Sequence, residues 1–173
     1  MLKRFIPDIY QENIFKIDYE KLKKKNIKCL LFDLDNTISP AREVVLCEKT
    51  KVLFNKLKKD FKIILFSNNF PKRVSEFGKF YDIDIVCLSL KPFSYKYRYI
   101  LKKYKYKKDE IAAIGDQLLT DIQGGNKVGI TTILVNPMSK IDERETWLNR
   151  KIESLIFEKF KKDNILLKER YYD

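Results

Sequence analysis

The segment that most constrains this chain is residues 30–37. An apolar run over residues 29–32 contains no turn residue and is typical of a buried strand. The run ends in two carboxylates that stand one residue apart, Asp33 and Asp35. Because alternate side chains of an extended backbone point the same way, both carboxylates are expected to face one small volume at the carboxyl end of the strand.

Two carboxylates this close repel each other, and the pKa of one of them rises unless a cation lies between them. A hard cation such as Mg²⁺, which prefers oxygen ligands and keeps several waters, meets that need. A solvated turn after a core strand is the other interpretation of this stretch. The rest of the chain favours the metal site.

Further strands are expected where apolar runs recur, and a helical pattern separates each run from the next. Together with residues 29–32, these runs cover residues 62–66, 83–88, 111–114 and 131–135. Strands that alternate with helices predict a parallel sheet with right-handed crossovers. The expected fold is therefore a three-layer, Rossmann-like α/β domain with a five-stranded sheet and helices on both faces.

The helices between these strands have recognisable apolar faces and end signals. One is expected from Leu46 to Leu57 and one from Pro71, as its first residue, to Tyr81. A third follows Pro92 with its inward side chains at Tyr97, Ile100, Leu101 and Tyr104. A fourth covers residues 118–128 and is stopped by Gly129.

Several kinds of chemistry are excluded by what the sequence lacks. There is no histidine, so His-based acid–base catalysis, His metal ligands and phosphohistidine are ruled out. No cysteine is followed six positions later by arginine, and no phosphate-binding Gly-x-x-x-x-Gly-Lys loop exists, because Ile130 follows Gly129. Any catalysis must rely on carboxylates, hydroxyls, lysine and a metal.

Charge and cysteine content suggest partners and location. The formal net charge of +12 favours phosphate esters, nucleic acid or an anionic membrane surface, although a lysine-rich composition without specific meaning is the alternative. Cys29, Cys47 and Cys87 are far apart and odd in number, so they fit reduced, mostly buried thiols better than a disulfide framework. No apolar run approaches the roughly 20 residues of a membrane span, and the start lacks a signal peptide's apolar region. We expect a cytoplasmic protein, with peripheral contact to the inner membrane surface left open.

Polar residues stand at or just beyond the ends of the predicted strands, where parallel sheets place their sites. Each residue suits a task in phosphoryl transfer. Asp33 is a candidate nucleophile and Asp35 a candidate general acid and base. Asp116 can complete a Mg²⁺ site, while Ser67 and Lys91 can bind the non-bridging phosphate oxygens.

Asp121 follows Asp116 by five residues, at the start of a predicted helix. It can hydrogen-bond a metal-bound water or the Lys91 ammonium. The alternative is an ordinary acidic residue in the first turn of a helix.

Four segments carry a resemblance to a known family: residues 33–37 (Asp-Leu-Asp-Asn-Thr), 67–69 (Ser-Asn-Asn), 91–92 (Lys-Pro) and 115–121 (Gly-Asp-Gln-Leu-Leu-Thr-Asp). They resemble the motifs of the haloacid dehalogenase (HAD) superfamily, closest to its subfamily IIIA and to the branch related to phosphatidylglycerophosphatases. The resemblance implies a Mg²⁺-dependent phosphomonoester hydrolase that works through an aspartyl-phosphate. The implied roles are catalytic for Asp33 and Asp35; phosphate-binding for Ser67, Asn68 and Lys91; metal-ligating for Asp33, the Asp35 carbonyl and Asp116; and supporting for Thr37 and Asp121.

The whole chain of 173 residues is expected to form a single HAD-like phosphatase domain. It comprises an N-terminal extension (1–25), a catalytic core (26–136) and a C-terminal helical region (137–173). In the extension, apolar residues recur at near-helical spacing around Pro7, and Asp18 is a candidate N-cap of a short helix.

The C-terminal region is expected to contain an amphipathic helix over residues 142–160. Its apolar side would carry Leu148, Ile152, Leu155 and Ile156. This helix and the segment 2–15 are candidates for membrane anchoring, with core packing as the alternative for both.

Members of this superfamily often carry a cap domain, but residues 38–46 and 86–91 are too short to form one. The site is therefore expected to be open, which suits a substrate that supplies its own cover. With the basic charge and the branch resembled, this predicts phosphatidylglycerophosphate at an anionic membrane surface as the substrate. Nucleic-acid ends, phosphoproteins and small phosphorylated metabolites are the alternatives.

Two rival functions use some of the same groups. A phosphoacceptor receiver domain also has acidic residues, a hydroxyl and a lysine on a parallel sheet, but Ser67 before Lys91 and the late Asp116 argue against its order of groups. A basic RNA-binding protein on this scaffold is the second rival, because residues 95–108 interleave tyrosines with lysines. A solvated helix face explains the same segment.

Overall fold

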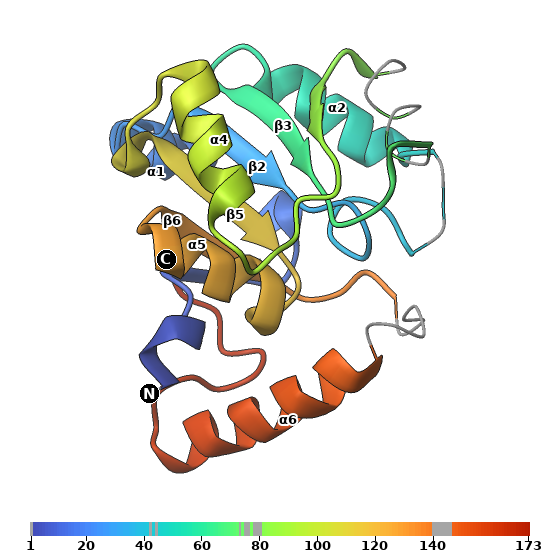
Figure 1. The fold of residues 1–173 in the computed structure, drawn as a ribbon. Coiled ribbons are helices and arrows are strands. Elements are labelled where there is room, and N and C mark those ends of the chain that lie inside the picture. Colours follow the sequence, from blue (N-terminus) through green and yellow to red (C-terminus); the bar gives the residue numbers. More distant parts are fainter. Residues whose placement is uncertain are drawn as a thin grey trace.

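The fold is described by a computed structural model that covers residues 2–41, 43, 45–72, 74, 77, 81–139 and 147–173. In these residues a parallel sheet of six strands has the order β1-β6-β5-β2-β3-β4. The strands are β1 (Ile9–Gln11), β2 (Cys29–Phe32), β3 (Lys62–Phe66), β4 (Asp84–Val86), β5 (Ile111–Gly115) and β6 (Thr131–Val135). This is the predicted Rossmann-like α/β architecture, with one strand more than expected (Figure 1).

Helices connect and cover the strands (Figure 1). The α-helices are α1 (Tyr19–Lys24), α2 (Glu48–Leu57), α4 (Tyr95–Tyr104), α5 (Gln123–Val128) and α6 (Trp147–Lys162). Shorter turns are η1 (Leu2–Phe5), η2 (Ile14–Lys16), η3 (Lys108–Glu110) and the π-helical η4 (Leu118–Ile122). Of the helix expected at 71–81, the described Pro71, Lys72, Val74, Phe77 and Tyr81 are helical.

Two hydrophobic cores lie on the two faces of the sheet, because successive side chains of each strand alternate between the faces. Leu30 and Phe32 of β2 pack in one core with Leu22 of α1 and Phe54 of α2. The other residues of β2 pack in the second core with residues of α4 and α5, including Leu31, Tyr97, Ile100 and Val128. Burial on both faces explains why the strands are continuous apolar runs.

The N-terminal segment corrects the five-strand prediction. The apolar residues of this segment have near-helical spacing, but Ile9–Gln11 forms strand β1. This strand pairs with β6, with Ile9 beside Ile133. Pro7 disfavours helical backbone at Ile6 and so separates η1 from the residues of β1, and Asp8 secures the pairing by accepting a 2.8 Å hydrogen bond from the Thr132 amide. The expected N-cap is confirmed, since the Asp18 carboxylate accepts from the Lys21 amide at 2.9 Å.

Core packing, the alternative to membrane contact, holds for most of this segment. Phe5, Ile9, Tyr10 and Ile14 are buried. The C-terminus returns to the same place, because Tyr10 and Tyr172 exchange two backbone hydrogen bonds of 2.9 Å.

The side of helix α6 that packs against the rest of the domain differs from the predicted one. Of its predicted apolar side, Ile156 is buried but Leu148, Ile152 and Leu155 are exposed. The helix instead buries Glu153, Ile156 and Phe160 against residues that include Phe5, Leu118 and Ile122. An acidic side chain on the buried side is tolerated because Glu153 is paired, as described below. Residues 142–146 of the predicted helix lie outside the described residues.

Three more expectations can be checked. The three cysteines are free thiols, as predicted, but the expectation that they are mostly buried is wrong, because Cys47 is exposed and Cys87 is half-buried. In the described parts of the connections, no inserted domain separates β2 from α2 or β4 from α4. The described helices include none with the length and apolarity that crossing a bilayer requires.

Candidate active site

The predicted site residues meet at the carboxyl edge of the sheet, around its central strands. Asp33 follows β2, Ser67 follows β3 and Asp116 follows β5. Successive strands add to one side of β2 as far as β4, and β5 then pairs on its other side. Strand order therefore reverses beside Asp33, which is where open parallel sheets place their pockets.

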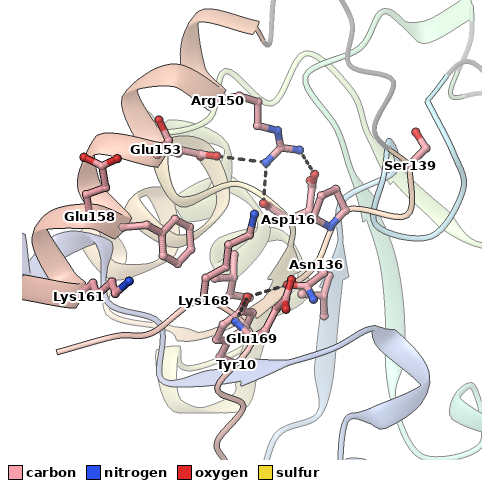
Figure 2. Close-up of a pocket in the computed structure, with 15 residues that line it drawn as sticks. Tyr10, Asp116, Asn136, Ser139, Arg150, Glu153, Glu158, Lys161, Lys168 and Glu169 are labelled. Carbon is pink, nitrogen blue, oxygen red and sulfur yellow. Dashed lines mark hydrogen bonds and ion pairs between the residues drawn. The ribbon is translucent and has the colours of Figure 1, made fainter. Parts of the chain in front are cut away.

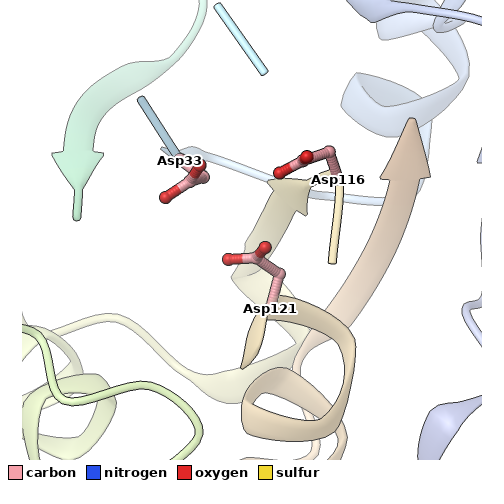
Figure 3. Close-up of side chains that lie close together, drawn as sticks. All are labelled: Asp33, Asp116 and Asp121. Carbon is pink, nitrogen blue, oxygen red and sulfur yellow. The ribbon is translucent and has the colours of Figure 1, made fainter. Parts of the chain in front are cut away.

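Three carboxylates converge at this point. One oxygen from each of Asp33, Asp116 and Asp121 lies within 4.8 Å of the other two. Figure 3 shows Asp33 and Asp116 at strand ends and Asp121 on the following helical turn, all directed toward a common space.

The approach of Asp121 depends on Gly115. A Cβ atom at Gly115 would lie 2.2 Å from the Asp121 Cγ, so only glycine leaves room for this carboxylate. Asp121 lies on the π-helical turn η4, and its Oδ2 accepts from the Gln117 amide at 3.2 Å. Its other oxygen remains directed at the cluster.

Lys91 supplies a buried positive charge to the same cluster. Its Nζ lies 2.5 Å from Asp33 Oδ1 and 2.6 Å from Asp121 Oδ1, and it donates to the Phe66 carbonyl at 2.9 Å. Burial alone would lower the pKa of Lys91, but the carboxylates of Asp121 and Asp33 outweigh it and raise that pKa. The lysine is therefore charged at every physiological pH.

The pKa of Asp33 is raised to about 8. Burial is the main cause; Lys91 opposes it, and the charges of Asp121 and Asp116 reinforce it. The single Lys91 ammonium thus leaves one negative charge of Asp33 and Asp121 unbalanced, beside Asp116, whose own partner is described below. A cation held by oxygen ligands alone fits this donor set, and Mg²⁺ has that preference.

Arg150 of α6 is a site residue that the sequence reasoning missed. Its Nη2 pairs with Asp116 Oδ2, and its Nη1 donates to the Asp116 carbonyl at 2.9 Å (Figure 2). Burial raises the pKa of Asp116 to about 6, although Arg150 lowers it. The pairing belongs to tertiary structure, because the two residues lie 34 positions apart.

Glu153 holds Arg150 from the other side. It accepts from Arg150 Nη1 at 3.1 Å and from the Leu119 amide at 3.0 Å. Burial raises its pKa to about 7, with Arg150 opposing. The one signal for it in the sequence is that Glu153 stands three positions before Ile156 in the predicted helix, and so lies on the same side as that buried residue.

Asp35 lies in the same pocket as Asp33 but outside the carboxylate cluster. Its Oδ2 accepts a hydrogen bond from the Asn69 side chain. Asn36 directly follows it with a φ of 61°, a left-handed backbone that asparagine tolerates and that turns the chain sharply. Thr37 then returns to the cluster, with its hydroxyl 3.4 Å from Asp33 Oδ2 and 3.3 Å from Asp116 Oδ1.

Ser67 and Asn68 lie side by side in the pocket but have different partners. The buried Ser67 hydroxyl oxygen accepts from the Asn69 amide at 3.1 Å. Asn68 Oδ1 accepts from the Lys91 amide at 2.8 Å and from the Ser89 hydroxyl at 2.6 Å, and its Nδ2 donates to the Lys91 carbonyl at 3.2 Å. Asn68 therefore holds the loop that carries Lys91.

The pocket itself is small and mostly polar. Its volume is about 280 Å³, enough for a phosphate group and part of its leaving group. Its lining includes Asp33, Asp35, Ser67, Asn68, Lys91, Gln117, Thr120 and Asn149. A larger cavity of about 700 Å³ between β6 and α6 also reaches Asp116 and Arg150 (Figure 2).

The sheet topology and the carboxylate cluster at its carboxyl edge are those expected of a HAD-like phosphatase. The family described as HAD-hydrolase-like matches residues 90–146, a range that includes Lys91, Asp116 and Asp121. The probable phosphatase YqeG of Bacillus subtilis (strain 168) is 36% identical over 164 residues, which cover 94% of this chain and 95% of that protein. The chain belongs to the HAD-like phosphatase family, as its motifs predicted.

Two more distant comparisons agree. Phosphatidylglycerophosphate phosphatase 1, chloroplastic/mitochondrial, of Arabidopsis thaliana is 24% identical over 148 residues, which cover 80% of this chain and 42% of that protein. A solved structure from Legionella pneumophila, described as a HAD superfamily subfamily IIIA hydrolase, superposes with a TM-score of 0.55 at 20% identity. The matched region covers 70% of this chain and 72% of the Legionella chain, and the likeness shows the fold.

Proposed function

We propose that this phosphatase is a Mg²⁺-dependent phosphomonoester hydrolase that forms an aspartyl-phosphate on Asp33 and acts on phosphatidylglycerophosphate. The observation that carries the mechanism is the convergence of three carboxylates on one point beside a buried ammonium. The substrate assignment rests on further arguments, given below.

In the first step a carboxylate oxygen of Asp33 attacks the phosphorus, and the bond from phosphorus to the leaving oxygen breaks. Asp35 donates a proton to that oxygen, so the product leaves as an alcohol. In the second step water attacks the phosphorus of the acyl phosphate and Asp35 accepts a proton of the water. The bond from phosphorus to the Asp33 oxygen breaks, so inorganic phosphate leaves and the Asp33 carboxylate is restored. The hydrogen bond from Asn69 orients the Asp35 carboxylate for both transfers.

Lys91 and Ser67 are the groups that we assign to phosphate binding. The Lys91 ammonium already lies 2.5 Å from the nucleophile, so it is placed to contact a phosphate oxygen beside Asp33. Ser67 accepts one backbone hydrogen bond, and its hydroxyl proton remains to be donated to the substrate. We assign Asn68 to positioning Lys91, in place of the direct phosphate contact that the sequence suggested.

Asp33, Asp116 and the main-chain carbonyl of Asp35 are the residues that we propose hold Mg²⁺. Bound there, the cation supplies positive charge against the carboxylates and the phosphate oxygens. Asp121 fixes Lys91, and Thr37 donates to the carboxylates that carry the site.

Three observations support the lipid substrate. The Arabidopsis relative carries the name of a phosphatidylglycerophosphate phosphatase. The net charge of +12 attracts the chain to anionic lipid, where each Lys or Arg near the surface contributes about 1 kcal/mol. In the described residues no cap domain closes the pocket, so a head group at a membrane surface can reach it.

The mechanism is tested by hydrolysis assays on the purified protein. Asp33→Asn is expected to abolish turnover while the fold is kept, because an amide cannot form the acyl phosphate. Asp35→Asn is expected to slow turnover by on the order of 10²–10⁴-fold. Full activity in EDTA, or in Asp33→Asn, would refute the mechanism.

The substrate is tested by comparing kcat/KM for phosphatidylglycerophosphate in anionic vesicles with that for soluble phosphomonoesters, a phosphoprotein and 3′- or 5′-phosphorylated RNA. We expect the lipid to be preferred, and high salt to narrow the preference by screening the surface charge. Equal or faster turnover of phosphorylated RNA would replace the lipid assignment with a nucleic-acid one.

A further inference from the structure

Large apolar side chains are exposed beside the active-site pocket. Phe70, on the loop after β3, is 73% exposed; Leu88, Leu90 and Phe93, on the loop after β4, are 37%, 57% and 66% exposed. The two loops are joined, because the Leu88 amide donates to the Asn69 carbonyl at 3.0 Å. Phe70 of the first loop and Lys91 of the second line the pocket, so the two loops lie at one side of it, and their four exposed apolar residues are here called the apolar rim.

Two residues of the apolar rim are held in an unfavourable backbone conformation. Leu88 has a φ of 47° and Leu90 a φ of 54°, in the left-handed region that bulky residues avoid. Because both side chains are exposed, burial of apolar surface contributes little free energy to offset this unfavourable conformation. Glycine or asparagine would fit the backbone better, so the leucine side chains have no evident role in folding.

The same loop carries the catalytic lysine. Ser89, between the two leucines, is fully buried and donates to Asn68, and Lys91 points into the carboxylate cluster. Inward polar residues thus alternate with outward leucines. The loop turns its apolar side away from the protein at the point where it delivers Lys91 to the substrate.

The charged side chains on the outer surface of the two rim loops and the start of α4 are basic. Apart from the buried Lys91, residues 67–72 and 87–99 contain Lys72, Lys96 and Arg98 as their only charged residues. Lys127 also reaches the rim, with its Nζ 6.0 Å from the centre of the Phe93 ring and 3.4 Å from the Pro92 carbonyl. An apolar border inside a basic surround complements a bilayer with anionic head groups.

We propose that the apolar rim docks on an anionic lipid bilayer, with Leu88, Leu90 and Phe93 inserted among the lipids and the pocket facing the head groups. The proposal rests on the proposed function, because it explains how the open site reaches a lipid phosphate. Phe70 and Phe93 suit either a bilayer or a stacked base, but the strained, exposed Leu88 and Leu90 suit hydrocarbon, whereas single-stranded nucleic acid is bound mainly by stacking on aromatic rings. A bilayer is therefore favoured over RNA as the occupant.

The experiment measures binding to vesicles of phosphatidylcholine with phosphatidylglycerol by co-sedimentation at low salt, without any turnover. Leu88→Asn/Leu90→Asn removes the apolar side chains and keeps residues that accept a left-handed backbone. We expect its vesicle affinity to fall by about tenfold or more. Its melting temperature should equal or exceed that of the wild type, and its turnover of a soluble phosphomonoester should be unchanged.

Leu155→Asn is the matched control. Leu155 is 64% exposed, on the outward side of α6, and has ordinary helical backbone. We expect it to bind vesicles like the wild type. Loss of binding in Leu155→Asn, with none in the double variant, would place the docking surface on α6 and overturn the proposal.

Three other results would also overturn it. The first is vesicle binding by the double variant that equals that of the wild type. The second is binding of the wild-type protein to vesicles of phosphatidylcholine alone that is as tight as its binding to anionic vesicles and does not change with salt. The third is tight binding of single-stranded RNA that the double variant loses, which would assign the apolar rim to nucleic acid. Vesicle binding that depends on the rim, without hydrolysis of phosphatidylglycerophosphate, would uphold the docking surface and refute only the proposed substrate.

Discussion

Replacing Lys91 by methionine keeps a side chain of similar length and removes the charge that the buried carboxylates share. The Lys91 side chain is 3% exposed, and its ammonium lies 2.5 and 2.6 Å from two carboxylate oxygens. Water therefore cannot take its place. Asp33 and Asp121 would lose their shared ammonium, and the Arg150 guanidinium, which pairs with Asp116, would be the cation that remains beside the three carboxylates.

Removing one partner of a buried ion pair costs about 3–5 kcal/mol of folding free energy. Asp33 can relieve part of this cost by protonation, because its pKa is already raised to about 8. At neutral pH without metal we therefore expect a loss of about 3 kcal/mol, the lower end of that range. Added Mg²⁺ restores positive charge at the same carboxylates. It should therefore stabilise Lys91→Met by more than about 1 kcal/mol beyond its effect on the wild type, which corresponds to about tenfold tighter Mg²⁺ binding by the variant.

Urea denaturation in EDTA and in Mg²⁺ measures both quantities, and activity assays should find turnover abolished. Lys102→Met is the control, because Lys102 is exposed on α4 and a surface change there is expected to move stability by less than about 0.5 kcal/mol. The reasoning fails if Lys91→Met matches the wild type in EDTA, or if Mg²⁺ stabilises both proteins equally.

Two further changes test the surroundings of the cluster. Burial raises the pKa of Glu153 from 4.5 to about 7, so the folded state binds this proton more tightly and stability is lost as pH rises from 4.5 through 7. Glu153→Gln should remove up to about 3 kcal/mol of that decline between pH 4.5 and 8, and an unchanged pH dependence in urea denaturation would contradict this. Gly115→Ala places a Cβ 2.2 Å from the Asp121 Cγ, so it should displace this partner of Lys91. We expect it to lower the free energy of unfolding by about 1–3 kcal/mol and to lower kcat. Wild-type stability and turnover would show that the close approach is not required.

Much of the fold could be predicted because its signals are local. Strand β2 and its neighbours are apolar runs of strand length, and each ends at a polar residue or a turn. Asp33, Ser67 and Asp116 directly follow the last residues of β2, β3 and β5, so a parallel sheet had to bring them to one edge. The alternation of strands with helices established that the sheet is parallel.

Two segments were misjudged because periodicity alone decided them. The segment before residue 15 has near-helical apolar spacing, but a free strand position beside β6 and the interruption at Pro7 made β1 more favourable. Helix α6 has enough apolar residues for two packing sides. The side with Ile156 and Phe160 is buried, because it meets Leu118 and Ile122, which the sequence could not place against it.

The sequence by itself determined the class of fold, the strand-end residues and the family, because each depends on residue type and on short spacings along the chain. Only the tertiary structure decided which side chains contact which carboxylate. Arg150 on Asp116, Asn68 on the Lys91 loop and Asp121 on Lys91 are contacts between residues 23 to 34 positions apart. No local pattern encodes such contacts, because they arise only when packing brings separate elements to one edge of the sheet and burial forces each charge to find a partner.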